Sequence, residues 1–195
     1  MDIRQQLFNA VYTLGQHQEI KSITVNDILQ TASVSRGSFY KYFADKYDVI
    51  NNYYQEAMIE IFKDCHEYTW EGIFTKSLTY LKAHQAFYKM TFQDAGQNSF
   101  TEFFHGELLR EFSNAIAIHS THPALTSDEQ KALAFYVDGF VTYTRHWALT
   151  GMQQPAAELG HDLHSFMPEL LCRIKLNIRH APLVSESHSR AAMQQ

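Results

Sequence analysis

The sequence predicts an all-α protein, and three observations indicate this fold class. Alternating apolar and polar runs, the pattern typical of strands, are almost absent from the 195 residues. Apolar side chains recur at helical spacing, and three of the four prolines fall near plausible helix boundaries. Two capping signals, Thr24 and Ser35, each open a short helical pattern.

Eight helical stretches are expected, namely 3–17, 24–31, 35–41, 46–68, 73–89, 99–118, 127–150 and 157–180. Pro168 lies inside the last stretch and should kink or split it, because its ring clashes with the preceding helical turn. Residues 181–195 lack periodic apolar positions and are expected to form a disordered tail.

The segment from Thr24 to Lys46 predicts a helix-turn-helix, a motif that typically binds DNA. Asp27 lies three residues after Thr24 and can complete a capping box with it. The short turn Thr31–Ser33 can set the two helices at a steep angle. Asp45 can cap a third helix, whose N-terminal end can bind phosphate.

This segment resembles the DNA-binding domain of the TetR family of bacterial regulators. The matching residues are Thr24, Val25, Asp27, Ile28, Ala32, Val34, Ser35, Gly37, Phe39, Tyr40, Tyr42, Phe43, Lys46, Val49 and Ile50. The family usually has glycine in the turn, where this chain has Ser33. If Ser33 is left-handed, it costs about 1 kcal/mol relative to glycine.

The resemblance implies a set of DNA-binding residues. They are Thr24, Ser35, Arg36, Gly37, Ser38, Tyr40, Lys41, Tyr42 and Lys46. Arg36, Ser38 and Lys41 are expected to reach base edges, since an arginine side chain can pair with guanine through two hydrogen bonds. Thr24, Lys46 and the two tyrosines are expected to position the duplex through its phosphates.

A fainter resemblance, to the branch of the family that includes regulators of dihydroxyacetone kinase operons, covers the remainder of the chain. It rests on Phe87-Tyr88, Gly96–Asn98, Phe135–Trp147 and Gly151. The resemblance implies a small-molecule effector. The expected ligand-binding residues are Trp70, Phe87, Phe104, Tyr143 and Trp147, although the same aromatic side chains can equally fill a helical core.

In the family the last two helices pair with those of a second subunit, which implies a homodimer here. The expected apolar seam comprises Phe135, Gly139, Leu163, Phe166, Leu170, Leu171, Ile174 and Ile178, which could also be ordinary core positions. We therefore expect a DNA-binding domain over 1–46 and a helical regulatory and dimerisation domain over 47–180.

The implied function is a homodimeric, ligand-responsive transcription regulator on a palindromic operator. Repression is the family default, but activators occur in the branch that the chain resembles. A ligand-independent or partner-controlled DNA-binding factor is an alternative, and a helical enzyme is disfavoured because no catalytic motif is present.

The charge distribution agrees with DNA binding. The net charge of −5 arises wholly after residue 50, because residues 1–50 hold equal numbers of basic and acidic side chains. Residues 33–46 hold three basic side chains and one acidic one, so the expected DNA-binding surface is locally positive.

Neither a cofactor nor a metal is expected. The pairs His119/His122 and His161/His164 have no further ligands of the kind that zinc needs. Glu102, Glu107 and Glu111 are interpreted as a solvated helix face.

The expected location is the cytoplasm. The chain has no apolar run long enough to span a bilayer and no export signal, so no membrane partner is expected. Cys65 and Cys172 are expected to be reduced, buried thiols, since they are too few and too far apart for a disulfide framework.

Overall fold

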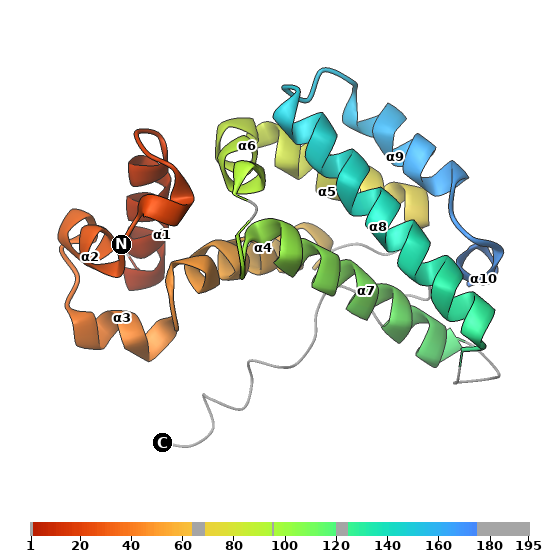
Figure 1. Cartoon of the computed structure of the whole chain (residues 1–195), viewed down its shortest axis with the longest axis horizontal. Coiled ribbons are helices and arrows are strands. Elements are labelled where there is room, and N and C mark those ends of the chain that lie inside the picture. Colours follow the sequence, from red (N-terminus) through yellow and green to blue (C-terminus); the bar gives the residue numbers. More distant parts are fainter. Residues whose placement is uncertain (1, 64–68, 95, 120–124, 175–195) are drawn as a thin grey trace.

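The structure, a computed structural model, describes residues 2–63, 69–94, 96–119 and 125–174. Within these residues the chain forms ten α-helices and one short 3-10 turn, with no strand (Figure 1). The predicted all-α fold is confirmed. No helix in these ranges is both long and apolar enough to cross a membrane.

The first part of the chain folds into short helices with the predicted caps. Its elements are α1 (Ile3–Gly15), η1 (Ile20–Ser22), α2 (Val25–Ala32), α3 (Arg36–Tyr42) and α4 (Lys46–Phe62). Thr24 and Asp27 form the predicted capping box at α2. Ser35 caps α3 and Asp45 caps α4, each through its side chain. The helix-turn-helix geometry therefore follows from local signals in the sequence.

The turn between α2 and α3 has a left-handed residue at the position where the resembling family usually has glycine. Ser33 has a φ of 54°, and its neighbour Val34 donates its backbone N–H to the carbonyl of Leu29 at 3.1 Å. Serine occupies a conformation that glycine adopts without steric cost, so this turn carries about 1 kcal/mol of strain.

The second part of the chain is a larger helical assembly. Its elements are α5 (Trp70–Ala83), α6 (Gln85–Gln93), α7 (Phe100–His119), α8 (Ser127–Leu149), α9 (Ala156–Ser165) and α10 (Glu169–Cys172). The single helix predicted over 73–89 was wrong, because the backbone of His84 (φ −110°, ψ 34°) leaves the helical conformation and separates α5 from α6. Pro168 divides the last predicted helix, as expected. Residues 175–195, including the predicted tail, lie outside the described residues.

Helices α5 and α9 pack most closely, because Gly160 presents no side chain at their crossing. A Cβ atom on Gly160 would lie 2.6 Å from Oγ1 of Thr75 and 3.0 Å from its backbone nitrogen. Helix α8 runs alongside this pair in Figure 1, while α7 lies below it. The resulting bundle places the exposed face of α8 next to α9.

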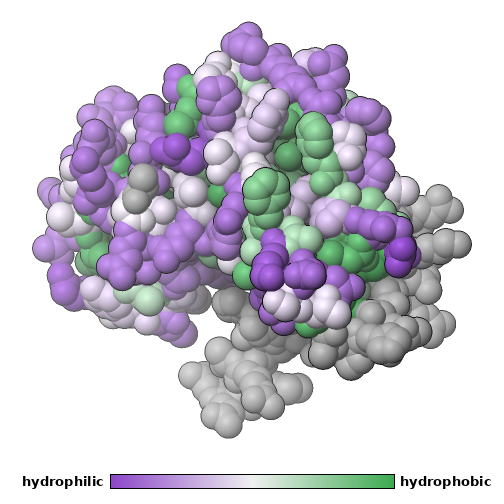
Figure 2. All heavy atoms as spheres, turned by 45° about the vertical axis from the view of Figure 1, so that its right-hand side comes forward, coloured by the Kyte–Doolittle hydropathy of each residue, from purple (hydrophilic) through white to green (hydrophobic). Residues whose placement is uncertain are grey.

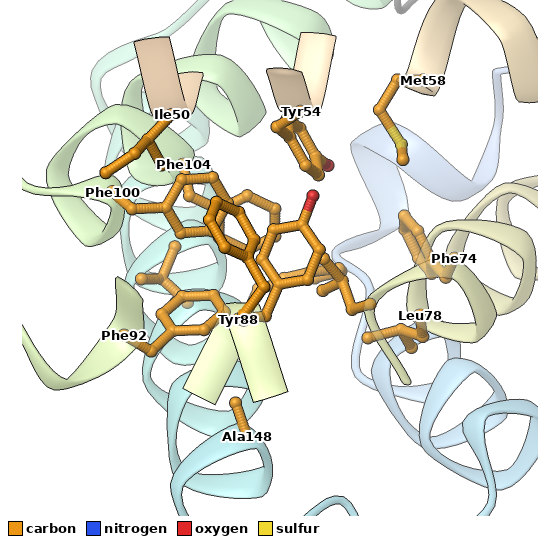
Figure 3. Packing of buried hydrophobic residues seen from close by; sticks show 14 of the residues in the cluster. Ile50, Tyr54, Met58, Phe74, Leu78, Tyr88, Phe92, Phe100, Phe104 and Ala148 are labelled. Carbon is orange, nitrogen blue, oxygen red and sulfur yellow. The ribbon is translucent and has the colours of Figure 1, made fainter. Parts of the chain in front are cut away.

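Aromatic rings form the centre of the larger assembly (Figure 3). Tyr54 of α4 lies with its ring centroid 5.5 Å from that of Phe100 and 5.8 Å from that of Phe104, both on α7. Tyr88 and Phe92 of α6 lie 5.4 Å and 5.0 Å from Phe100. Edge-to-face pairs of this kind add about 0.5–1.5 kcal/mol each beyond the area that they bury.

A smaller aromatic cluster, which we call the joint, connects the first helices to the second part of the chain. The ring of Phe8 in α1 stacks on Tyr53 of α4 with centroids 3.4 Å apart. Both rings contact Phe87 of α6, at centroid distances of 5.0 Å and 5.9 Å. Since α4 packs against helices of both parts, the expected domain boundary at residue 46 stays a prediction.

The left-handed turn leads to a test of local strain. Replacing Ser33 with glycine should raise the free energy of unfolding by about 0.5–1 kcal/mol, because glycine adopts this φ without a steric cost. Ser35→Gly serves as the control, since Ser35 has a φ of −70° and caps α3. That change should lower the free energy of unfolding by a few tenths of a kcal/mol. Urea denaturation measures both, and no gain for Ser33→Gly would contradict the account.

Candidate functional site

Helix α3 presents one buried side and one exposed side. Phe39 is fully buried and anchors the helix to the core. Tyr40 and Tyr42 expose 51% and 39% of their surfaces, and Lys41 is also exposed. In Figure 1 the helix lies at the opposite end of the molecule from α9 and α10. The exposed side of α3 is therefore free to meet a large partner.

Arg36 is held in place at the start of α3. Its Nη2 donates a hydrogen bond of 2.6 Å to Oδ1 of Asn26 on α2, and its guanidinium lies 5.9 Å from the Tyr40 ring centroid. The guanidinium has five N–H donors, so most remain available to another acceptor. A side chain that is both oriented and exposed suits the reading of a base edge.

Lys46 stabilises the segment before α2, a role that its position in the sequence did not indicate. Its Nζ donates to the backbone carbonyls of Lys21 at 2.8 Å and Ile23 at 2.7 Å. Burial lowers the pKa of the Lys46 ammonium group. Two of its three N–H donors are thus used to hold the segment before α2, and one remains for a phosphate.

Gly37 is a glycine that the fold does not require. A Cβ atom built on it meets nothing within 4 Å, and its φ is not in the left-handed region. Glycine in a helix costs up to about 1 kcal/mol relative to alanine. Neither packing nor backbone conformation therefore accounts for a glycine at this exposed position on α3.

The hydroxyl groups predicted to face DNA also have partners within the chain. The Thr24 hydroxyl donates to Oδ2 of Asp27 at 2.7 Å and accepts from the Asp27 N–H at 3.2 Å. The Ser35 hydroxyl accepts from the N–H of Ser38 at 3.1 Å and lies 2.9 Å from its hydroxyl. All nine predicted DNA-binding residues lie at the starts of α2 and α4 or along α3. Their contacts with DNA stay a prediction.

The five aromatic residues predicted to bind a ligand do not share one site. Trp70 and Phe104 line a cavity of about 40 Å³ between α4, α5, α7 and α8. Phe87 belongs to the joint, and Trp147 is buried with its indole N–H donated to the Gln154 carbonyl at 3.0 Å. Tyr143 is 52% exposed on α8. The cavity has room for about one water molecule.

Glu111 corrects the prediction of a solvated carboxylate face on α7. Glu102 is exposed and Glu107 is half-buried, but Glu111 is only 3% exposed and lines the cavity. Burial raises the pKa of the Glu111 carboxyl to about 8, against the smaller opposing effect of Arg110. The spacing of Phe104, Leu108 and Glu111 on one helix face could have indicated this burial.

The Glu111 carboxyl is poorly satisfied. Nη2 of Arg110 lies 2.9 Å from its Oε1, but the same nitrogen donates a 2.5 Å hydrogen bond to Glu107. Neither oxygen of Glu111 accepts a hydrogen bond from the part of the chain that the structure describes. Buried polar groups without partners are uncommon and call for an explanation.

The outer face of α8 and α9 exposes aromatic side chains. Phe135 and Phe166 expose 83% and 73% of their surfaces and border an open groove of about 410 Å³, which Gly139 and Tyr143 also line. Figure 2 shows hydrophobic residues gathered on this side of the molecule, beside a mainly hydrophilic region around the first helices.

The residues of the predicted seam differ in their exposure. Leu163 lines the groove but is only 4% exposed, and Leu171 is fully buried within the chain, as the alternative of an ordinary core position expects. Leu170 and Ile174 are half-buried, and Ile178 lies outside the described residues.

The remaining candidates for chemistry lie apart from these surfaces. Nδ1 of His161 and of His164 lie 3.3 Å and 3.7 Å from carboxylate oxygens of Glu71. No group of three or more potential metal ligands occurs among the described residues. Cys172 is a free, exposed thiol on the one-turn helix α10, which corrects the prediction that it is buried. The described residues do not include Cys65, His122 or the side chain of His119.

Comparison with known proteins points to transcriptional regulators. A protein-family model described as "Transcriptional regulator C-terminal region" matches residues 68–169. The "HTH-type dhaKLM operon transcriptional activator DhaS" of Lactococcus lactis subsp. lactis (strain IL1403) is 31% identical over 80 residues. That alignment spans 40% of this chain and 43% of the relative, so the chain matches less than half of its length.

Solved structures share the fold at low sequence identity. The "Dihydroxyacetone kinase operon activator DhaS" has a TM-score of 0.58 and 21% identity, covering 88% of this chain and 96% of that one. A TetR transcriptional regulator from Streptococcus agalactiae 2603V has a TM-score of 0.57 and 19% identity, covering 89% and 94%. At these identities the likeness shows the fold alone.

The buried carboxyl leads to a test of pH dependence. The pKa of Glu111 is near 8 in the folded chain and 4.5 ordinarily. Between these values the folded state holds a proton that the unfolded chain has lost, so stability falls as pH rises. The loss should reach at most about 5 kcal/mol by pH 8. Denaturation at several pH values measures it.

A pair of glutamine variants isolates the responsible group. Glu111→Gln should remove most of the decrease, because its amide does not titrate. Glu102→Gln, at an exposed position on the same helix, should retain the full decrease. Equal pH profiles for the native chain and Glu111→Gln would show that Glu111 titrates normally.

Proposed function

Because the chain belongs to the TetR family of transcriptional regulators, we propose that it is a homodimer that binds a palindromic operator through α3 and responds to a small molecule. The observation that carries this proposal is the exposed side of α3, where Arg36 is oriented and Gly37 leaves open space. The known relatives that support it are regulators, which disfavours an enzyme.

The DNA-binding part of the proposal divides the residues of α3 into those that contact bases and those that contact phosphates. Arg36 contacts a base edge with the N–H donors that do not bind Asn26, and Ser38 and Lys41 lie in the same major groove of the DNA. Tyr40 and Tyr42 contact phosphates beside it. Two copies of α3 would enter successive major grooves, about 34–36 Å apart.

The dimer part of the proposal rests on the outer face of α8 and α9. Burying a phenylalanine side chain stabilises a complex by about 1.5–3 kcal/mol, so Phe135 and Phe166 are costly to leave in water. A Cβ atom on Gly139 would also meet open space, which leaves room for a side chain of the second copy. Contact through this face leaves both α3 helices uncovered.

We propose repression as the direction of regulation, since occupying an operator suffices to block transcription and needs no further partner. Activation is the second candidate, because the relative from Lactococcus lactis is named a transcriptional activator. The effector would widen the cavity at Trp70 and Phe104, and the resulting movement would shift the dimer between states of different DNA affinity.

The open space at Gly37 gives a test of DNA contact. Gly37→Ala should raise the free energy of unfolding by up to about 1 kcal/mol, yet weaken binding to the preferred duplex at least about tenfold. Gly106→Ala is the matched control, since Gly106 also lies on an exposed helix face with nothing within 4 Å of its Cβ position. It should gain stability without losing DNA affinity. If both variants bound DNA with equal affinity, the proposal that α3 contacts DNA would be contradicted.

The exposed phenylalanines give a test of dimerisation. The double variant Phe135→Glu/Phe166→Glu should sediment as a monomer at micromolar concentration while remaining folded, because both side chains are exposed within one chain. Ile59→Glu, at a 42% exposed position on α4, should remain dimeric. A double variant that sediments as a dimer would contradict this interface, and a monomeric native chain would contradict the dimer itself.

A further inference from the structure

We infer that Asn26 of α2 positions Arg36 for contact with a guanine in each half of the operator, and so helps to determine which DNA sequence the chain prefers. The inference rests on the proposed function and deepens it, because it names the base and a residue outside α3 that selects it. Asn26 is not among the predicted DNA-binding residues. Its part in DNA binding follows from its contact with the Arg36 guanidinium.

This contact connects the first turn of α2 to the first turn of α3. Asn26 is the second residue of α2, and Arg36 is the first residue of α3. Nη2 of Arg36 donates a hydrogen bond of 2.6 Å to Oδ1 of Asn26. A guanidinium can only donate, so the amide oxygen of Asn26 must face it. Both residues are exposed, so the pair lies on the surface of the helix-turn-helix.

The Tyr40 ring restrains the same guanidinium by a second contact. Tyr40 follows Arg36 by one helical turn, and its ring centroid lies 5.9 Å from Cζ of Arg36. The aromatic ring and the hydrogen bond to Asn26 together limit the rotation of the planar group. An arginine side chain without such partners samples many rotamers and could bind a phosphate or any base acceptor that it met.

The partner of Arg36 is also suitable in its charge. Asn26 carries a neutral amide, so it orients the guanidinium without cancelling the positive charge that attracts DNA. Arg4, Arg110 and Arg173 instead pair with carboxylates of the chain. Arg36 is therefore both oriented and available to an acceptor on another molecule.

The donors that remain on Arg36 suit guanine. Nη2 carries two N–H groups and Asn26 binds one of them, so one of the two pairs of parallel donors on the guanidinium stays complete. In the major groove guanine presents two acceptors, O6 and N7, whereas adenine presents one acceptor beside a donor. An arginine held in one orientation can bind both acceptors of guanine, but it directs one N–H at the amino group of adenine. By holding Arg36, Asn26 increases the difference in affinity between the two purines.

Competition binding with synthetic duplexes tests the inference on the full chain. The starting duplex is the one that the native chain selects from random DNA, and the contacted position is the one at which Arg36→Ala loses its base preference. At that position the native chain should prefer guanine to adenine at least about tenfold. Asn26→Ala should reduce this preference at least about threefold and leave binding to scrambled duplexes unchanged. If Arg36→Ala keeps the native preference at every position, Arg36 reads no base and the inference is overturned.

Further variants separate positioning from direct contact, and thermal unfolding should show that each one folds. Asn26→Asp retains an acceptor for Arg36 and adds a negative charge, so it should keep the guanine preference while weakening binding to all duplexes alike. Gln30→Ala changes another exposed side chain of α2 and should leave the preference intact. In the Arg36→Ala background, Asn26→Ala should have no further effect on base preference, since Asn26 acts through Arg36.

The possible results distinguish failure of this inference from failure of the proposed function. Full guanine preference in Asn26→Ala, or its loss in Asn26→Asp, would overturn the inference and leave DNA binding standing. A further loss of preference when Asn26→Ala is added to Arg36→Ala would show that Asn26 contacts a base itself, which also overturns it. A native chain that prefers no duplex would refute the proposed function, and the inference with it.

Discussion

The aromatic joint of Phe8, Tyr53 and Phe87 is the contact on which the arrangement of the molecule depends. Its rings stack or meet edge to face across α1, α4 and α6. Helix α1 also packs against α2 and α3, so the joint sets where α3 lies relative to α8 and α9. If two copies meet through α8 and α9, the same contact sets the separation of the two α3 helices. A movement of the helices around the cavity would therefore have to pass through α1, α4 or α6, which this joint connects, before it could displace α3.

Local signals in the sequence predicted the first helices well, because short-range hydrogen bonds determine them. The caps Thr24, Ser35 and Asp45 need only a partner three residues away, and all three form. The break at Pro168 likewise follows from the covalent geometry of proline. The left-handed Ser33 could be anticipated only from the glycine that is usual in the family's turn, because a side chain disfavours this conformation. The task of Lys46 could not be read in this way, since its carbonyl partners lie more than twenty residues earlier.

Tertiary packing decided the features that the sequence did not reveal. The aromatic residues of the second part share helical spacing whether they fill the core or line a cavity, so Trp70 and Trp147 could not be distinguished. Glu111 carries the same carboxyl as Glu102, and only the neighbouring helices make one buried and the other exposed. The break at His84 has no proline or glycine to mark it.

The central claim is that two copies of α3, held at a fixed separation, read a symmetric DNA site. Selection of bound duplexes from random DNA with the native chain tests it most directly. The account predicts enrichment of one palindromic sequence whose half-sites have centres about one helical turn, 10–10.5 base pairs, or a multiple of it apart. Recovery of unrelated sequences, or of a single half-site without its symmetric counterpart, would contradict it.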